Sequence, residues 1–121
     1  ALGREAHKKL EDSREEVAGI LGARAGEIIF TSGGTEGNNI AIQGAVFAWQ
    51  EKNKNELKGK ILPHIITTNI EHPGILETCK YIEQNGGEVT YVPVEESGIV
   101  DPKKIAGIVN DKTTPDTAVF E

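Results

Sequence analysis

Cysteine, methionine and positive charge are all scarce in this sequence. It has one cysteine, Cys79, and no methionine. A single cysteine can form neither an internal disulfide nor a CxxC metal site, so the sequence is typical of a protein from a reducing compartment. No apolar stretch approaches the roughly 18 residues needed to span a bilayer, and the charged N-terminus lacks a secretory signal. We therefore expect a cytoplasmic protein with no membrane partner, whose start lies upstream because no methionine begins it.

The deficit of positive charge limits the possible partners. The formal net charge is −6, the sequence pI is near 5.1, and no Lys/Arg run exceeds two residues. Nucleic acids and anionic membranes attract proteins through basic patches, which this sequence does not provide. The composition therefore excludes a nucleic-acid-binding surface and favours a small molecule or a protein as partner.

What the sequence does contain is an alternation of two hydrophobic periods. At 121 residues and 37% hydrophobic content it suits one globular domain or a piece of a larger one. Helical spacing and helix-end signals predict helices over about 3–22, 35–52, from Pro73 to a stop at 85–87, and from Pro102, capped by Asp101, to about Val109. Short apolar runs predict strands at 27–32, 64–70, 88–94 and, just beginning, 116–121, with a polar loop at 53–60.

This alternation predicts an α/β fold. Strands separated by helices form βαβ units around a parallel or largely parallel sheet. Right-handed crossovers would cover both faces of that sheet only if further elements followed residue 121. The sequence therefore predicts part of a larger domain.

The turn SGGTEGNN, residues 32–39, lies between a predicted strand and a predicted helix. A helix N-terminus offers unpaired N–H groups and a partial positive charge, which suit a phosphate. Gly33 and Gly34 would allow positive φ and close approach of the backbone to a ligand, while Ser32 and Thr35 offer hydroxyl groups. The alternative is that Thr35 only caps the helix. The turn matches neither Walker A, since no lysine follows the glycines, nor GxGxxG.

Two longer segments resemble a known family. EIIFTSGGTEGNNIAIQGA (27–45) and HIITTNIEHPGILETCKYIEQNGGEVTYVPVEESGIVDPKKI (64–105) resemble the N-terminal half of the large domain of cysteine desulfurases. These are pyridoxal-phosphate enzymes of the class V aminotransferase superfamily. The resemblance covers nearly the whole chain, with two motifs in the correct order and spacing. It implies that residues 1–121 form a three-layer, mainly parallel part of a fold-type I transferase large domain, incomplete at both ends.

The resemblance also implies roles for individual residues. Gly34 and Thr35 match the residues that bind the cofactor phosphate, with Ser32 and Gly33 shaping the loop. His72, in NIEHPG, matches the histidine that stacks on the pyridine ring and transfers protons; the alternative is a helix-capping or surface histidine. The sequence departs from many relatives at Ile70, where a threonine or another polar residue is usual. His7, His64, Trp49 and Glu71 are expected to have structural or surface roles.

The groups that complete the chemistry in this family are not matched within the chain. Cys79 lies in an apolar helical stripe, where a structural thiol belongs, whereas the family's nucleophilic cysteine lies on a loop far downstream. The Schiff-base lysine and the carboxylate that pairs with the pyridinium nitrogen also come later, and Lys60, Lys80 and Lys103 are not at matching positions. The chain alone is therefore expected to be inactive and not to bind the cofactor covalently.

The implied parent activity is removal of sulfur from L-cysteine, giving alanine and an enzyme persulfide for iron–sulfur cluster assembly or other sulfur transfer. The implied partners are a sulfur-acceptor or scaffold protein and, in a homodimer, a second copy; no metal is expected. Two alternatives stay open. One is another class V enzyme, such as a selenocysteine lyase, a sulfur-lyase relative or an aminotransferase. The other is a standalone, non-catalytic protein that serves as a scaffold or phosphate binder.

Overall fold

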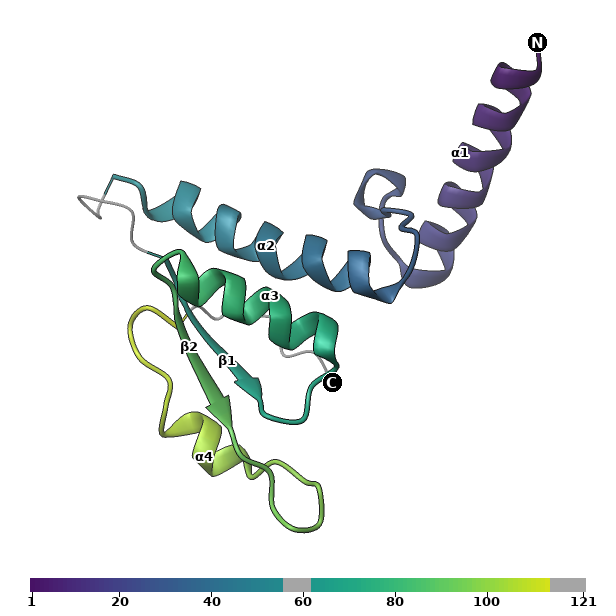
Figure 1. Ribbon diagram of the computed structural model, residues 1–121. Coiled ribbons are helices and arrows are strands. Elements are labelled where there is room, and N and C mark those ends of the chain that lie inside the picture. Colours follow the sequence, from purple (N-terminus) through teal and green to yellow (C-terminus); the bar gives the residue numbers. More distant parts are fainter. Residues whose placement is uncertain (56–61, 114–121) are drawn as a thin grey trace. The chain divides into compact units, whose positions relative to one another are not determined.

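The computed structural model describes residues 1–55 and 62–113 (Figure 1). The chain divides into two compact units, Ala1–Ser32 and Gly33–Glu121. The elements, in chain order, are α1 (Leu2–Leu21), η1 (Ala25–Glu27), α2 (Gly34–Asn53), β1 (His64–Thr68), α3 (Pro73–Gln84), β2 (Glu88–Val92) and α4 (Pro102–Ala106). The predicted helices and the strands at β1 and β2 are present, with small differences at their ends.

The first unit consists of α1 and the segment that follows it. Gly22 ends the helix in the left-handed region, at φ 66°, where glycine carries no steric penalty. The guanidinium of Arg14 lies 4.9 Å from the centroid of the Phe30 ring and also donates to the carbonyl of Ile28. Ala18 is buried at 3% exposure. This cation–π contact and hydrogen bond, together with the bond from the amide of Ala23 to the carbonyl of Ala18, join the segment to the helix.

The strand predicted at residues 27–32 is wrong. Ala25–Glu27 form a 3₁₀ turn, and the residues after it form no strand ladder. Ile28 has extended dihedral angles, but its carbonyl accepts a hydrogen bond from Arg14 instead of from a neighbouring strand. In the described part of the chain the sheet joins β1 to β2, so an apolar extended run without a partner strand is not part of it.

The second unit contains a βαβ arrangement. β1 and β2 pair in parallel, with Ile66 opposite Thr90, and α3 forms the connection between them. This confirms the parallel pairing predicted from sequence. The connection turns sharply at Gly87, where a Cβ would lie 2.4 Å from Cγ2 of Ile82. Only glycine fits there without a shift of the helix end.

The core of the second unit lies around α3, which packs against α2 on one side and β2 on the other (Figure 1). Its buried members are Ile42 from α2 and Ile75, Cys79 and Ile82 from α3. The α3 residues repeat at intervals of three and four, so they share one helical face. Partly buried apolar residues of α2, of both strands and of the segment before β1 complete this cluster, namely Val46, Leu62, Ile65, Val89 and Tyr91.

The end of the described chain returns to the start of the sheet. Asp101 caps α4 by accepting from the amide of Lys103 at 2.9 Å, as predicted, but the helix ends at Ala106 instead of about Val109. A turn closed by Asn110 and Thr113 follows, and it brings the hydroxyl of Thr113 to 2.7 Å from Nδ1 of His64. The strand predicted at 116–121 lies outside the described residues.

His64 has the structural role expected for it, although it is far more buried than its polar character suggests. Its exposure is 1%, and Nε2 lies 2.8 Å from the hydroxyl of Thr90 on the neighbouring strand. Both ring nitrogens are therefore bonded within the protein. Across residues 1–55 and 62–113, no helix is both long and apolar enough to cross a membrane.

We expect Ile82→Val to lower the free energy of unfolding by about 1 kcal/mol, because it removes a methylene from the closed core around α3. Ile82 is 4% exposed, whereas Ile99 is 67% exposed and serves as the matched control. Urea unfolding followed by circular dichroism measures both variants. Equal losses for Ile82→Val and Ile99→Val would contradict the packing described for α3.

Candidate functional site

The N-terminal ends of α2 and α3 lie next to each other in the second unit. α2 begins at Gly34 after the N-cap residue Gly33, which has no side chain to cap it. The first N–H groups of a helix have no intrahelical acceptor. The start of α2 therefore presents backbone donors and a partial positive charge, as predicted for a phosphate site. The alternative that Thr35 caps this helix is wrong, because Thr35 lies inside its first turn.

The two glycines of the turn do not have the backbone conformation predicted for them. Gly33 has φ 168° and ψ 178°, an extended conformation open to any residue, and Gly34 is helical. A Cβ at either position would meet no heavy atom within 4 Å. The backbone at these two glycines is therefore open, so a ligand could approach their amide groups.

Thr35 and His72 come together through Gly74. A Cβ on Gly74 would lie 3.3 Å from Nδ1 of His72 and 3.3 Å from Cγ2 of Thr35. Sequence segments 37 positions apart thus meet at one backbone position, where the absence of a side chain permits the close approach. This is the arrangement that the two motifs predict. Ser32 belongs to the other compact unit.

His72 has a capping role as well as a place in the site. It is the N-cap residue of α3, and its Nδ1 accepts from the amide of Gly74 at 3.0 Å. Because a backbone N–H can only donate, Nδ1 carries no proton and the neutral ring carries its proton on Nε2. The capping alternative raised from sequence is therefore correct, and the cap also fixes the orientation of the imidazole.

A cavity of about 690 Å³ opens between the two helix ends, within the size range of small-molecule sites. Both Thr35 and His72 line it, whereas Gly33, Gly34 and Glu36 do not. The other residues around it come from the same two helices and are Asn39, Gln43, Pro73, Gly74, Glu77, Thr78 and Tyr81. The only carboxylate among these is Glu77, which is paired with Lys80 at 2.7 Å.

Asn39 and Thr78 are among the polar residues of this cavity that sequence reasoning missed. The hydroxyl of Thr78 donates to Oδ1 of Asn39 at 2.8 Å, and Nδ2 of Asn39 donates to the carbonyl of Thr35 at 3.0 Å. Both residues lie four positions after a residue of the site, Asn39 after Thr35 and Thr78 after Gly74. Helical periodicity places such pairs on one face, and that signal could have identified them.

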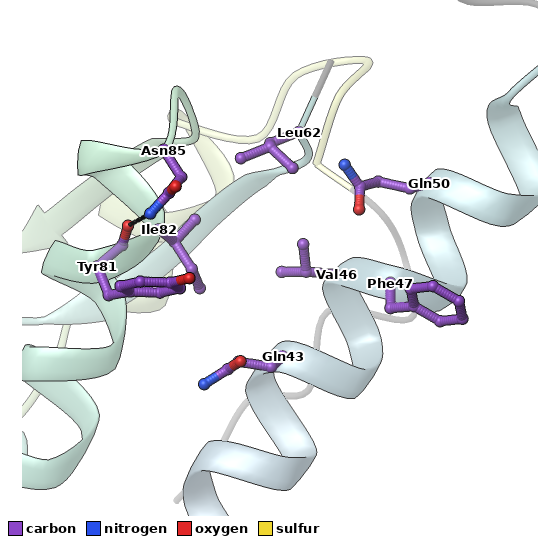
Figure 2. Close-up of a pocket in the computed structure, with 8 residues that line it drawn as sticks. All are labelled: Gln43, Val46, Phe47, Gln50, Leu62, Tyr81, Ile82 and Asn85. Carbon is purple, nitrogen blue, oxygen red and sulfur yellow. Dashed lines mark hydrogen bonds between the residues drawn. The ribbon is translucent and has the colours of Figure 1, made fainter. Parts of the chain in front are cut away.

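A second cavity, of about 330 Å³, lies further along the same helix pair (Figure 2). Val46 and Ile82 point into it from facing helices, with Leu62 at its edge, while Phe47 turns away (Figure 2). Its described lining carries no charged side chain. The helix N-termini, which favour anions, lie at the first cavity and not at this one. In the described parts of the chain, no three His, Cys, Asp or Glu residues gather as metal ligands.

Cys79 is placed as a structural thiol. It is 1% exposed within the core cluster, and burial, followed by the charges of Glu83 and Glu71, raises the pKa of its thiol from 9.0 to about 11. A thiol that stays protonated at neutral pH is a poor nucleophile. Glu71 accepts from the hydroxyl of Thr68 at 2.8 Å just after β1, which agrees with its expected structural role.

The second unit combines a parallel βαβ arrangement with a cavity of small-molecule size at two helix N-termini. The sequence model of the family described as "Aminotransferase class-V" matches residues 1–115. The chain is a member of the class V aminotransferase family and is homologous to its cysteine desulfurases.

Individual relatives agree with this assignment. The chain is 48% identical over 101 residues to the cysteine desulfurase IscS of Dictyoglomus turgidum, covering 84% of the chain and 23% of that relative. A solved NifS-like protein matches with a TM-score of 0.74 at 36% identity, over 93% of the chain and 29% of that structure. A solved structure of SspA in complex with cysteine matches with a TM-score of 0.72 at 34% identity, over 92% and 29%. The chain spans about a quarter of the length of the relatives it matches.

We expect the thiol of Cys79 to react with an aromatic disulfide reagent about a hundredfold more slowly in the folded chain at pH 8 than in the urea-unfolded chain. The reason is that burial suppresses both access and ionisation. The same shift makes folding stability fall as pH rises from about 9 toward 11, since the unfolded chain loses the thiol proton first. Absorbance of the released thiolate measures the rate, and equal rates in both states would show that Cys79 is reactive.

Proposed function

We propose that this chain supplies the phosphate- and ring-binding part of a pyridoxal-phosphate-dependent cysteine desulfurase. The observation that carries the proposal is the meeting of Thr35, at the start of α2, with His72 at the edge of one cavity. The family membership supports it, because the relatives that match over most of this chain are cysteine desulfurases. In this proposal residues 1–121 are part of a fold-type I large domain with a mainly parallel sheet.

The residues present fit a phosphorylated aromatic cofactor. The amides of Gly34 and Thr35 and the hydroxyl of Thr35 would bind the phosphate, since helix N-termini favour anions. Gly33 and Ser32 would complete the loop. The free space where Cβ atoms would lie on Gly33 and Gly34 lets the ligand reach the backbone. The cavity volume of about 690 Å³ is large enough for such a ligand.

His72 would stack on the cofactor ring and hold a proton at Nε2. Its Nδ1 is engaged by the amide of Gly74, so the ring cannot rotate freely and its face keeps a fixed orientation. Two aromatic rings prefer an offset-stacked or an edge-to-face geometry, and an imidazole held in one orientation allows only one of these two geometries. With Nδ1 engaged in the cap, the neutral ring presents its Nε2–H group as a hydrogen-bond donor to a ligand.

The chemistry of the parent reaction would draw on groups beyond these. When bound, pyridoxal phosphate supplies an electron sink for cleavage of bonds in an amino-acid substrate. The substrate proposed here is L-cysteine, in agreement with the relative solved in complex with cysteine. Sulfur would then pass through a downstream cysteine to an acceptor or scaffold protein, in a homodimer. Other class V activities, such as selenocysteine cleavage or transamination, use the same binding half and are the alternative.

We expect pyridoxal 5′-phosphate to shift the amide resonances of Gly34 and Thr35 in the ¹⁵N-labelled chain, with pyridoxal binding at least about tenfold more weakly because it lacks the phosphate. Thr35→Val should weaken binding by about fivefold through loss of one hydrogen bond, and Thr35→Ser should retain it. Heteronuclear correlation spectra during titration measure all four cases.

His72 provides the matched control for ring binding. Asparagine is a good N-cap residue, so His72→Asn should keep the stability of α3 while losing the stacked ring. His72→Ala should lose both, at about 1 kcal/mol of stability. If His72→Asn binds pyridoxal phosphate as tightly as the wild type, the histidine only caps the helix and the stacking role is wrong.

We expect a longer protein that carries this sequence together with the family's later segments to convert L-cysteine to alanine with one equivalent of sulfide under reducing conditions. This chain alone should form no alanine and no covalently bound, absorbing cofactor, because it lacks the matched lysine. Amino-acid analysis and sulfide detection measure both products. Transfer of an amino group to a keto acid without sulfide release would support the aminotransferase alternative instead.

A further inference from the structure

The close approach of Thr35 to His72 requires the two helix ends to be fixed in register. The apolar cluster of Ile42, Ile75, Cys79 and Ile82 presses α2 against α3, but apolar packing is not directional. A small slide of one helix along the other would keep much of this contact and separate the site residues. A directional interaction at the N-terminal ends is needed to prevent it.

The hydrogen bond between Thr78 and Asn39 supplies that direction. Thr78 is buried at 4% exposure, and its hydroxyl lies 2.8 Å from Oδ1 of Asn39 on the other helix. The same hydroxyl lies 2.8 Å from the carbonyl of Gly74, one turn earlier on its own helix. Since a hydroxyl has one proton, the two acceptors share it, and Thr78 is committed to protein partners.

The orientation of the Asn39 amide follows from its neighbours. Nδ2 lies 3.0 Å from the carbonyl of Thr35, which can only accept, so the NH₂ group must point there and Oδ1 must point to Thr78. Gln43 also donates to Oδ1, at 3.2 Å. Both ends of the Asn39 amide are therefore hydrogen-bonded, which holds it in one orientation.

These contacts form a closed ring. It runs from the carbonyl of Thr35 through Asn39 and Thr78 to the carbonyl of Gly74, and it closes where a Cβ on Gly74 would lie 3.3 Å from Cγ2 of Thr35. The Asn39–Thr78 bridge, meaning these two side chains and their mutual hydrogen bond, thus joins the two residues that meet at the site. A hydrogen bond from a buried hydroxyl to an oriented amide favours one geometry.

We propose that Asn39 and Thr78 are positioning residues that fix Thr35 against His72 and so determine phosphate affinity at this site. The identity of the ligand in this inference rests on the proposed function, whereas the positioning of the two helix ends does not. A variant without the Thr78 hydroxyl keeps every group that is proposed to bind the ligand. It loses the hydrogen bond to Asn39 that positions those groups. Thr78→Val keeps the shape of the side chain, and Thr78→Ser keeps the hydroxyl.

The experiment compares Thr78→Val, Thr78→Ser and a matched control, Thr90→Val, which removes a hydroxyl bonded to His64 away from the helix ends. The first readout is the nuclear Overhauser contact between the Thr35 methyl group and the Gly74 α-protons in the ligand-free chain. We expect Thr78→Val to lose this contact and the two other variants to keep it.

The second readout is affinity for pyridoxal 5′-phosphate and, separately, for inorganic phosphate. Thr78→Val should bind both about fivefold more weakly, as expected for one lost hydrogen bond, while Thr78→Ser and Thr90→Val bind as the wild type does. Asn39→Ala should cause the same loss, and combining it with Thr78→Val should add little, since both break one link. If Thr78→Val fails to fold, the Thr35–Gly74 contact and the ligand affinities are measured on Asn39→Ala instead.

Retention of the Thr35–Gly74 contact in Thr78→Val would overturn the inference, as would an equal loss of affinity in Thr90→Val. Failure of the proposed function gives a different result. If the wild-type chain shows the contact but binds neither ligand, the cofactor assignment is wrong, and the ligand-free spectra of the variants still decide whether the bridge positions the two helix ends.

Discussion

The approach of two helix N-termini is the constraint on which the candidate site depends. Gly74 lies where a side chain would crowd both Thr35 and His72, so the absence of a Cβ lets α3 begin against the first turn of α2. The apolar cluster beneath, from Ile42 to Ile82, supplies most of the attraction. The hydrogen bond between Asn39 and Thr78 gives that attraction a fixed register. The cavity lined by Thr35 and His72 opens at this junction.

The same junction explains how an acidic chain can offer a site for an anion. The net charge of −6 opposes long-range attraction of phosphates. Helix N-termini act locally, within about one turn, and their backbone donors do not depend on net charge. The carboxylate that lines the cavity, Glu77, is paired with Lys80, which reduces its repulsion. In the proposed function, selectivity for an anion would therefore come from backbone geometry.

His72 shows how one side chain can serve both fold and site. As N-cap of α3 it stabilises the helix that carries half of the core, and the cap in turn fixes the tautomer and plane of its ring. Cys79 and His64 are the contrasting cases, because each is buried and neither faces the cavity. The candidate site residue His72 thus lies at the N-terminal end of α3, whereas the structural residues Cys79 and His64 lie further along α3 and at the start of β1.

The sequence by itself determined the helices, the two parallel strands and the capping role of Asp101, and its two motifs, by their resemblance to a known family, led to the expectation that Thr35 and His72 serve one site. Each of these depends on local spacing or on a motif that the chain carries. Only the tertiary structure decided that 27–32 is not a strand, because strand formation requires a partner that a local pattern cannot reveal. It also decided that Gly33 and Gly34 need no left-handed conformation, and that Asn39 meets Thr78 across 39 positions of sequence. Contacts between distant residues arise from the packing of whole helices, and no window of the sequence contains both partners.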